Sequence, residues 1–151
     1  MIDETDRKIL RLLQENARMT NKELAAKLDL SITPVYERVK KLERKGYIKG
    51  YSARLDHEKI GKGMMVFMHL KLQVHTHENI RHVIEEVDHL EEVMECYHVT
   101  GETDYLLKVM VKDMPAYETF VVEKLTKIKG IANINSSIVM STVKSTTSLD
   151  V

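Results

Sequence analysis

The sequence predicts an α+β protein with a helical N-terminal region and a C-terminal region that mixes strands and helices. In the first third of the chain, apolar residues recur every three or four positions, as they do on one face of a helix. From Met64 every second residue is apolar instead, as on one face of a strand, and the residues between them change from apolar to polar along the segment. The change of period therefore separates two regions of different structure.

Charge changes at the same place as the period. Residues 1–60 hold 14 Lys and Arg against 10 Asp and Glu, whereas residues 61–151 hold 9 against 13. The Gly61-Lys62-Gly63 break also lies there. We therefore expect two domains, at residues 1–55 and 56–151.

Three short helices are expected in the N-terminal domain. A capping box at Thr20 and Glu23 begins the second one, and Ser31 is placed to cap the third, with Pro34 in its first turn. The expected helices span about residues 3–16, 21–28 and 32–45. The tight turn between the second and third helices is typical of a helix-turn-helix, which binds DNA.

The third helix has a narrow apolar stripe of Val35, Val39 and Leu42, and a broad, mainly basic face opposite to it. Solvent exposure alone would account for many such faces, but three capped helices favour a recognition helix in a major groove. Lysines and arginines there would bind phosphates or guanines, and residues near its N-terminus would reach base edges. The predicted DNA-binding residues are Ser31, Thr33, Tyr36, Glu37, Lys40, Lys41, Arg44 and Lys49.

The segment "YIKGYSARL" follows the third helix and is rich in residues that favour strands. We expect either a wing of the DNA-binding domain or a strand leading to the next domain. Lys49 and Arg54 would add phosphate contacts from this segment.

The C-terminal domain is expected to have the order βαββαβ, which is a ferredoxin-like arrangement with a four-stranded antiparallel sheet and both helices on one face. The expected strands cover about residues 64–74, 91–99, 105–111 and 131–143, and the helices about 78–87 and 115–129. Met65 and Phe67 fall on the other sheet face, which argues that a second copy covers it.

The segments "LAAKLDLSITPVYERVKKLERKGYIKGYSARLD" and "GETDYLLKV" resemble the Lrp/AsnC (feast/famine) family of prokaryotic transcription regulators over nearly the whole chain. This resemblance implies a winged helix-turn-helix joined to a RAM domain, named for regulation of amino-acid metabolism. It also implies homodimers that often assemble into octamers, with an amino-acid effector bound between dimers. No enzymatic activity or cofactor is implied.

The resemblance places the effector site at the loop between the second and third strands of the C-terminal domain. Backbone amides there could bind a carboxylate, and Glu102 or Asp104 an ammonium group, although a tight hairpin also needs Gly and Asp for its own geometry. An aromatic residue usual in the family is replaced by Thr103. The predicted effector-binding residues are Gly101, Glu102, Thr103, Asp104 and Ser136, with Ser137 a further candidate.

Two other constellations are weaker. His75, His77 and His82 near Glu78 could hold a metal ion, but they lack the helical spacing of a ligand pair, so solvated histidines are expected. Cys96 and His98 could share a strand face, but we expect Cys96 to be a buried structural residue in mid-sheet. No apolar run approaches the length of a membrane span, so we expect no membrane partner and a cytoplasmic location.

The sequence thus predicts a DNA-binding transcription regulator that responds to an amino acid. Two alternatives stay open. An architectural DNA-binding protein would need no effector, and an enzymatic or metal-sensing module could carry a DNA-binding head.

Overall fold

A computed structural model describes residues 2–151 of the protein and divides them into two compact units. The first unit contains the residues up to Arg54 together with Val143–Val151, and the second contains Leu55–Thr142. The elements in chain order are α1 (Glu4–Glu15), α2 (Asn21–Leu28), α3 (Ile32–Arg44), β1 (Met64–Leu72), α4 (His77–Asp88), β2 (Val93–His98), β3 (Tyr105–Val111), α5 (Met114–Glu123), a short 3-10 helix (Leu125–Lys127) and β4 (Ile131–Ile138).

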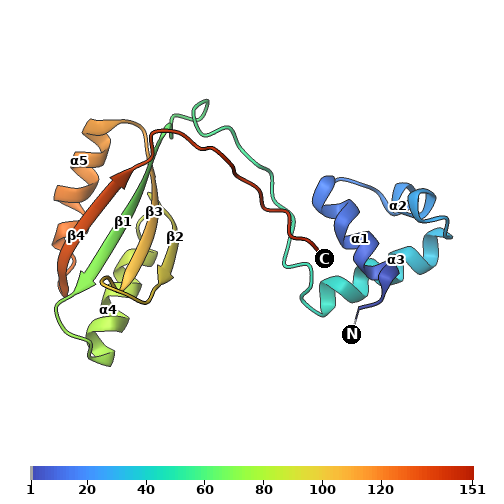
Figure 1. The fold of residues 1–151 in the computed structure, drawn as a ribbon, viewed down its shortest axis with the longest axis horizontal. Coiled ribbons are helices and arrows are strands. Elements are labelled where there is room, and N and C mark those ends of the chain that lie inside the picture. Colours follow the sequence, from blue (N-terminus) through green and yellow to red (C-terminus); the bar gives the residue numbers. More distant parts are fainter. Residues whose placement is uncertain (1) are drawn as a thin grey trace. The chain divides into compact units, whose positions relative to one another are not determined.

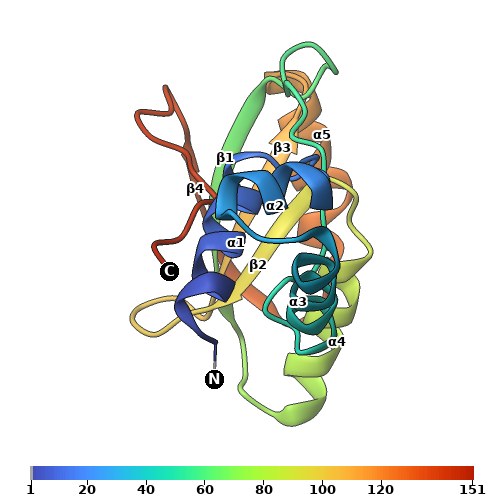
Figure 2. The same cartoon turned by 90° about the vertical axis from the view of Figure 1, so that its right-hand side faces the viewer.

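The first unit is built from α1, α2 and α3, which are grouped in Figure 2. The expected capping box of α2 is confirmed. The Thr20 side chain accepts a hydrogen bond from the Glu23 amide, and the Glu23 carboxylate accepts one from the Thr20 amide. A second capping box, between Asp3 and Asp6, begins α1. The buried apolar residues of this unit are Ile9, Leu13, Leu24, Ala25, Val35, Val39 and Leu42.

Helix α3 follows the predicted outline. Val35, Val39 and Leu42 are buried, which confirms the narrow apolar stripe. Ser31 is the N-cap residue, but its side chain makes no capping hydrogen bond. Gly46 follows the end of the helix with φ at 73°, a conformation that favours glycine.

The segment after α3 forms no strand within the described residues. Tyr47, Tyr51 and Leu55 are all largely exposed. A strand needs a neighbouring segment to accept and donate its main-chain hydrogen bonds, and no described segment pairs with this one.

The C-terminal tail belongs to the first unit. Nε2 of Gln14 on α1 donates to the Leu149 carbonyl at 2.9 Å, and the Leu149 amide donates to Oε1 of Gln14 at 2.6 Å. The two bonds join one side-chain amide to one main-chain position. Leu149 also lines a shallow pocket with Leu10 and Tyr47.

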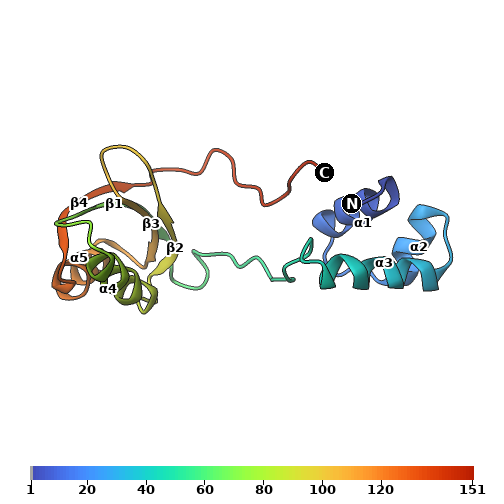
Figure 3. The ribbon, with the colours of Figure 1, turned by 90° about the horizontal axis from the view of Figure 1, so that it is seen from below.

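The second unit is a four-stranded antiparallel sheet in the order β2-β3-β1-β4, which confirms the ferredoxin-like topology (Figure 1). Helices α4 and α5 lie on one face of the sheet (Figure 3). The core between them holds alternate β1 and β3 residues, such as Met68 and its partner Leu107, together with Phe120 from α5. Met65 and Phe67 alternate with these core residues and are half-buried on the opposite face.

Several boundaries differ from the predictions. Strand β1 ends at Leu72 and not at Val74, a residue that is 52% exposed. Within α4, the apolar Ile84 lies one position after the buried Val83, yet it is 43% exposed. Strand β4 ends at Ile138 and not at Val143, although the Val139 amide still donates to the Met65 carbonyl at 3.0 Å.

Candidate nucleic-acid interface and effector loop

The outward face of α3 carries the predicted base-reading residues. Thr33, Tyr36 and Glu37 are exposed, and they lie in the N-terminal half of the helix. Lys40 is exposed as well, with its ammonium group 5.9 Å from the centre of the Tyr36 ring. Lys40 also donates to Glu43 at 2.8 Å, and this hydrogen bond raises the pKa of Lys40.

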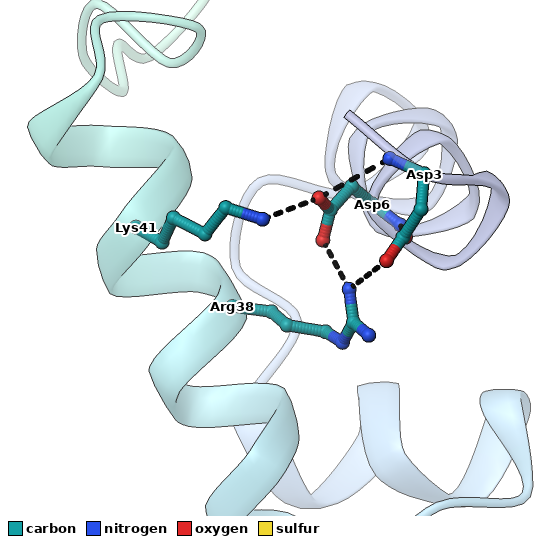
Figure 4. Close-up of polar contacts among 4 residues, drawn as sticks. All are labelled: Asp3, Asp6, Arg38 and Lys41. Carbon is teal, nitrogen blue, oxygen red and sulfur yellow. Dashed lines mark hydrogen bonds and ion pairs between the residues drawn. The ribbon is translucent and has the colours of Figure 1, made fainter. Parts of the chain in front are cut away.

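Lys41 lies differently, because it faces α1. Its Nζ donates to Oδ2 of Asp6 at 2.9 Å, and Nη1 of Arg38 donates to Oδ1 of Asp6 at 2.7 Å and to Oδ2 of Asp3 at 2.6 Å (Figure 4). Asp6 is fully buried. The structure therefore pairs two cations of α3 with carboxylates of the first helix.

Arg44 and Lys49 are exposed, and neither forms an ion pair with a described side chain. Glu43 beside them is engaged on two sides, by Lys40 and by the Tyr51 hydroxyl, which donates to it at 3.2 Å. Arg44 and Lys49, like the exposed Arg54, are thus predicted phosphate-binding cations that the fold leaves available.

The predicted effector loop connects β2 to β3. Gly101 has φ at 120°, a conformation that L side chains rarely adopt. Gly101 and Glu102 are exposed, whereas Thr103 and Asp104 are partly buried. The loop is closed by a main-chain bond in which the Val99 amide donates to the Asp104 carbonyl at 2.9 Å.

Asp104 uses both carboxylate oxygens inside the domain. Oδ2 accepts from the Leu72 amide at 2.7 Å, and Oδ1 lies 2.6 Å from Nε2 of His75. These two partners, the Leu72 amide first, lower the pKa of Asp104. Asp104 therefore holds the end of β1 to the start of β3, an arrangement that the sequence alone did not indicate.

Ser136 lies elsewhere within the chain. It pairs with Met68 on the far side of β1 from β3, and it lines a pocket with Tyr117 and Val121 of α5. No loop residue from Gly101 to Asp104 lines this pocket. The structure thus brings together the four loop residues but does not bring Ser136 to them within one described chain.

The prediction for Cys96 is wrong in its position. Cys96 is exposed, on the edge strand β2 and not in mid-sheet. Local desolvation, and then the charge of Asp88, raise the pKa of its thiol, which disfavours a reactive thiolate. His98 stacks on Tyr105 with ring centres 5.0 Å apart.

Known proteins resemble the chain over nearly its full length. Residues 2–49 match the family model described as winged helix-turn-helix DNA-binding, and residues 65–149 match the model described as Lrp/AsnC ligand binding domain. The fold and these matches define a DNA-binding transcription regulator with a ligand-binding domain. The chain belongs to the Lrp/AsnC family, whose members are regulators and not enzymes.

Individual relatives agree with this assignment. The Bkd operon transcriptional regulator of Pseudomonas aeruginosa is 40% identical over 94% of the chain and 93% of its own length. The leucine-responsive regulatory protein of Escherichia coli is 38% identical over 95% and 87%. A transcriptional regulator of Neisseria meningitidis, solved as an L-Met complex, matches with a TM-score of 0.94 and 38% identity over 99% and 96%.

Among the described residues, none of the helices is long and apolar enough to cross a bilayer.

Proposed function

We propose that an amino acid, or a closely related small molecule, binds the C-terminal domain and changes how the protein binds its DNA. The observation that carries this proposal is the match, over 99% of the chain, to a regulator solved with L-Met. The match to the ligand-binding family model over residues 65–149 supports the same conclusion.

The loop after β2 offers the chemistry that a zwitterion requires. Its exposed main chain around Gly101 can donate amide hydrogens to a carboxylate. An ammonium group binds best to a carboxylate, but both carboxylate oxygens of Asp104 already contact other groups, the Leu72 amide and the His75 ring. Glu102 is exposed and makes no side-chain hydrogen bond with a described residue, so we assign the ammonium contact to Glu102.

Thr103 and Ser136 complete the proposed effector-binding set. Thr103 is partly buried beside Glu102, and Ser136 is half-buried on the edge strand β4. Because no loop residue lines the pocket beside Ser136, the proposed site combines the loop of one chain with Ser136 of another. Such a site between copies would link effector binding to the arrangement of the assembly.

Self-association is a second part of the proposal. The sheet face opposite α4 and α5 carries the half-buried Met65 and Phe67, and a second copy would cover them. A symmetric dimer would present two copies of α3 to half-sites about one turn of DNA, or a multiple of it, apart. Effector binding would then act by changing how dimers associate.

A fluorescence-anisotropy titration tests the proposal. Labelled DNA from upstream of the protein's own gene is titrated with protein, alone and with each of the common amino acids. We expect one or a few amino acids to change the apparent Kd, and we expect Glu102→Gln to remove that change without altering effector-free binding. Glu118→Gln, on the exposed surface of α5, is the matched control and should retain the response.

The opposite outcome is equally informative. Tight binding that no amino acid alters, in affinity or in oligomer size, would replace the proposal by an architectural DNA-binding protein without an effector.

A further inference from the structure

The buried carboxylate of Asp6 gives the first turn of α1 an unusual environment. Asp6 is fully buried, and it is the only charged residue buried in the described part of the chain. Its neighbours in the helix at three and seven positions, Ile9 and Leu13, are core residues. Asp6 therefore occupies the apolar stripe of α1 and points toward α3, as Figure 4 shows.

Charged partners on α3 compensate for this burial. Arg38 and Lys41 stand one helical turn apart and each donates to a different oxygen of Asp6, at 2.7 and 2.9 Å. Asp3 adds a second acceptor for Arg38 at 2.6 Å, and its own carboxylate accepts from the Asp6 amide at 2.8 Å. A buried charge is tolerated only with such partners, so the three contacts act together.

The ion pairs restrain α3 in addition to its apolar stripe. Val35, Val39 and Leu42 hold the helix by close packing, and two directed bonds to one carboxylate further fix its rotation about its axis. That rotation decides which side chains face outward. Thr33 and Glu37, on the outward face, depend on it for their direction.

The same contacts remove two cations from the DNA-facing charge. Lys41 and Arg38 are held against carboxylates, so each is largely neutralised for a phosphate that approaches α3. Non-specific DNA binding depends on the number of phosphates neutralised, and each lost contact lowers the salt slope by about one unit. Pairing Lys41 and Arg38 inward therefore weakens binding to arbitrary DNA.

We infer that Asp6 is a positioning residue for DNA recognition, which orients α3 for base contacts and withholds Arg38 and Lys41 from phosphates, so that sequence specificity rises. Asp6 touches no DNA in this scheme and acts only through its two partners. The inference rests on the DNA-binding domain alone and is independent of the proposed amino-acid effector.

Asp6→Asn tests this inference, because it keeps the size and one acceptor but removes the charge. Anisotropy is measured over a range of salt concentrations with the upstream DNA and with a scrambled duplex of equal length. We expect the salt slope on scrambled DNA to steepen by up to about two units, and the ratio of specific to scrambled affinity to fall by about tenfold. A merely structural role would weaken both duplexes together and leave the salt slope unchanged, which would overturn the inference.

Two further variants sharpen the test. Asp3→Asn removes the charge of the second, more exposed acceptor of Arg38 and keeps a side-chain oxygen that can accept from the Asp6 amide, so its salt slope should change by about one unit at most. Lys41→Gln retains a donor for Asp6, and it keeps the inference falsifiable if Asp6→Asn fails to fold. An unchanged salt slope in Lys41→Gln supports the inward role of Lys41, whereas a slope about one unit shallower means that Lys41 binds phosphate and overturns it.

Discussion

At the scale of single residues, the charges of α3 divide into two groups that the sequence cannot separate. Lys41 and Arg44 are three positions apart and look equivalent on a helical projection, yet Lys41 meets the buried Asp6 whereas Arg44 is exposed. The signal that could have separated them is Asp6 itself, which stands at helical spacing before Ile9 and Leu13. An acid in an apolar stripe requires a cationic partner from another helix.

Arg44→Ala should weaken binding to every DNA sequence and lower the salt slope by about one unit, because an exposed arginine neutralises one phosphate.

Glu37→Ala should instead leave the salt dependence of binding nearly unchanged and reduce the preference for the upstream DNA. Both effects are measured by anisotropy on specific and scrambled duplexes. If neither variant changes binding, α3 is not the recognition helix.

Acid should destabilise the first unit through Asp6. Burial raises the pKa of Asp6, but the bonds from Lys41 and Arg38 outweigh burial and hold that pKa below the ordinary value for an aspartate. A carboxyl whose pKa is lower in the folded state stabilises the fold above its unfolded pKa, and this stabilisation is lost as the pH falls through the folded value. The stability of the protein should therefore fall steeply only below about pH 4.

Urea unfolding followed by circular dichroism measures this dependence between about pH 7 and pH 3. Asp6→Asn should be less stable than the natural protein at neutral pH, and the difference should shrink in acid because the natural protein loses its ion pairs there. Parallel loss of stability in both proteins would show that another carboxyl controls the acid transition.

At the scale of elements, periodicity and capping predicted most of the fold. The box at Thr20, the stripe of Val35, Val39 and Leu42, and the alternation in β1 are local patterns, and all three are present. The errors concern positions that depend on neighbours. Ile84 has an apolar side chain at a helical position, but how much of it is covered depends on the breadth of the sheet below.

The loop between β2 and β3, where we predict effector binding, shows the same limit on prediction from sequence. Its position and its glycine were predictable, since a hairpin between two strands needs a residue with positive φ, and Gly101 provides it. The contacts of Asp104 with Leu72 and His75 were not predictable, because these partners are about 30 residues away in the chain. Only the register of β1 and β3 brings them together.

Gly130 gives a test at the junction between the 3-10 helix and β4. Its φ is 96°, and a Cβ there would lie 1.9 Å from Oδ1 of Asn79, whose Nδ2 donates to the Val74 carbonyl. Gly130→Ala should therefore destabilise the C-terminal unit by about 2 kcal/mol. Thermal unfolding measures the loss.

Gly50→Ala is the control for this change. A Cβ at Gly50 meets no atom within 4 Å, and its φ is not in the left-handed region. Its effect should stay within about 0.5 kcal/mol. Equal effects at Gly50 and Gly130 would mean that glycine flexibility, and not the contact with Asn79, determines the loss.

At the scale of the whole molecule, the two units have different tasks and different surfaces. The first carries α3, the predicted recognition helix, and the second presents a sheet whose outer face holds half-buried Met65 and Phe67. A regulator that binds paired DNA half-sites needs two DNA-binding units, and one chain contains one such unit. The sheet face is where we place the contact between copies.

Phe67→Asp should shift the protein toward monomer, because a carboxylate would be buried at the centre of that contact. Sedimentation velocity measures the mass, and anisotropy should show weaker binding to the upstream DNA with it. Val122→Asp is the control, since Val122 is 59% exposed on α5 and lies on the other side of the sheet. An unchanged mass for Phe67→Asp would place the dimer contact elsewhere.

The two hydrogen bonds between the Gln14 side chain and the Leu149 main chain bear on which fragments of the chain keep the first unit whole. A fragment cut at the linker after Arg54 would contain α1, α2 and α3 but would lack the nine residues that complete their unit. Gln14 would lose both of its main-chain partners, and Leu10 and Tyr47 would lose the leucine beside them. A DNA-binding fragment that keeps these contacts therefore needs both ends of the chain, joined for example by a Gly/Ser connection in place of the ligand-binding unit.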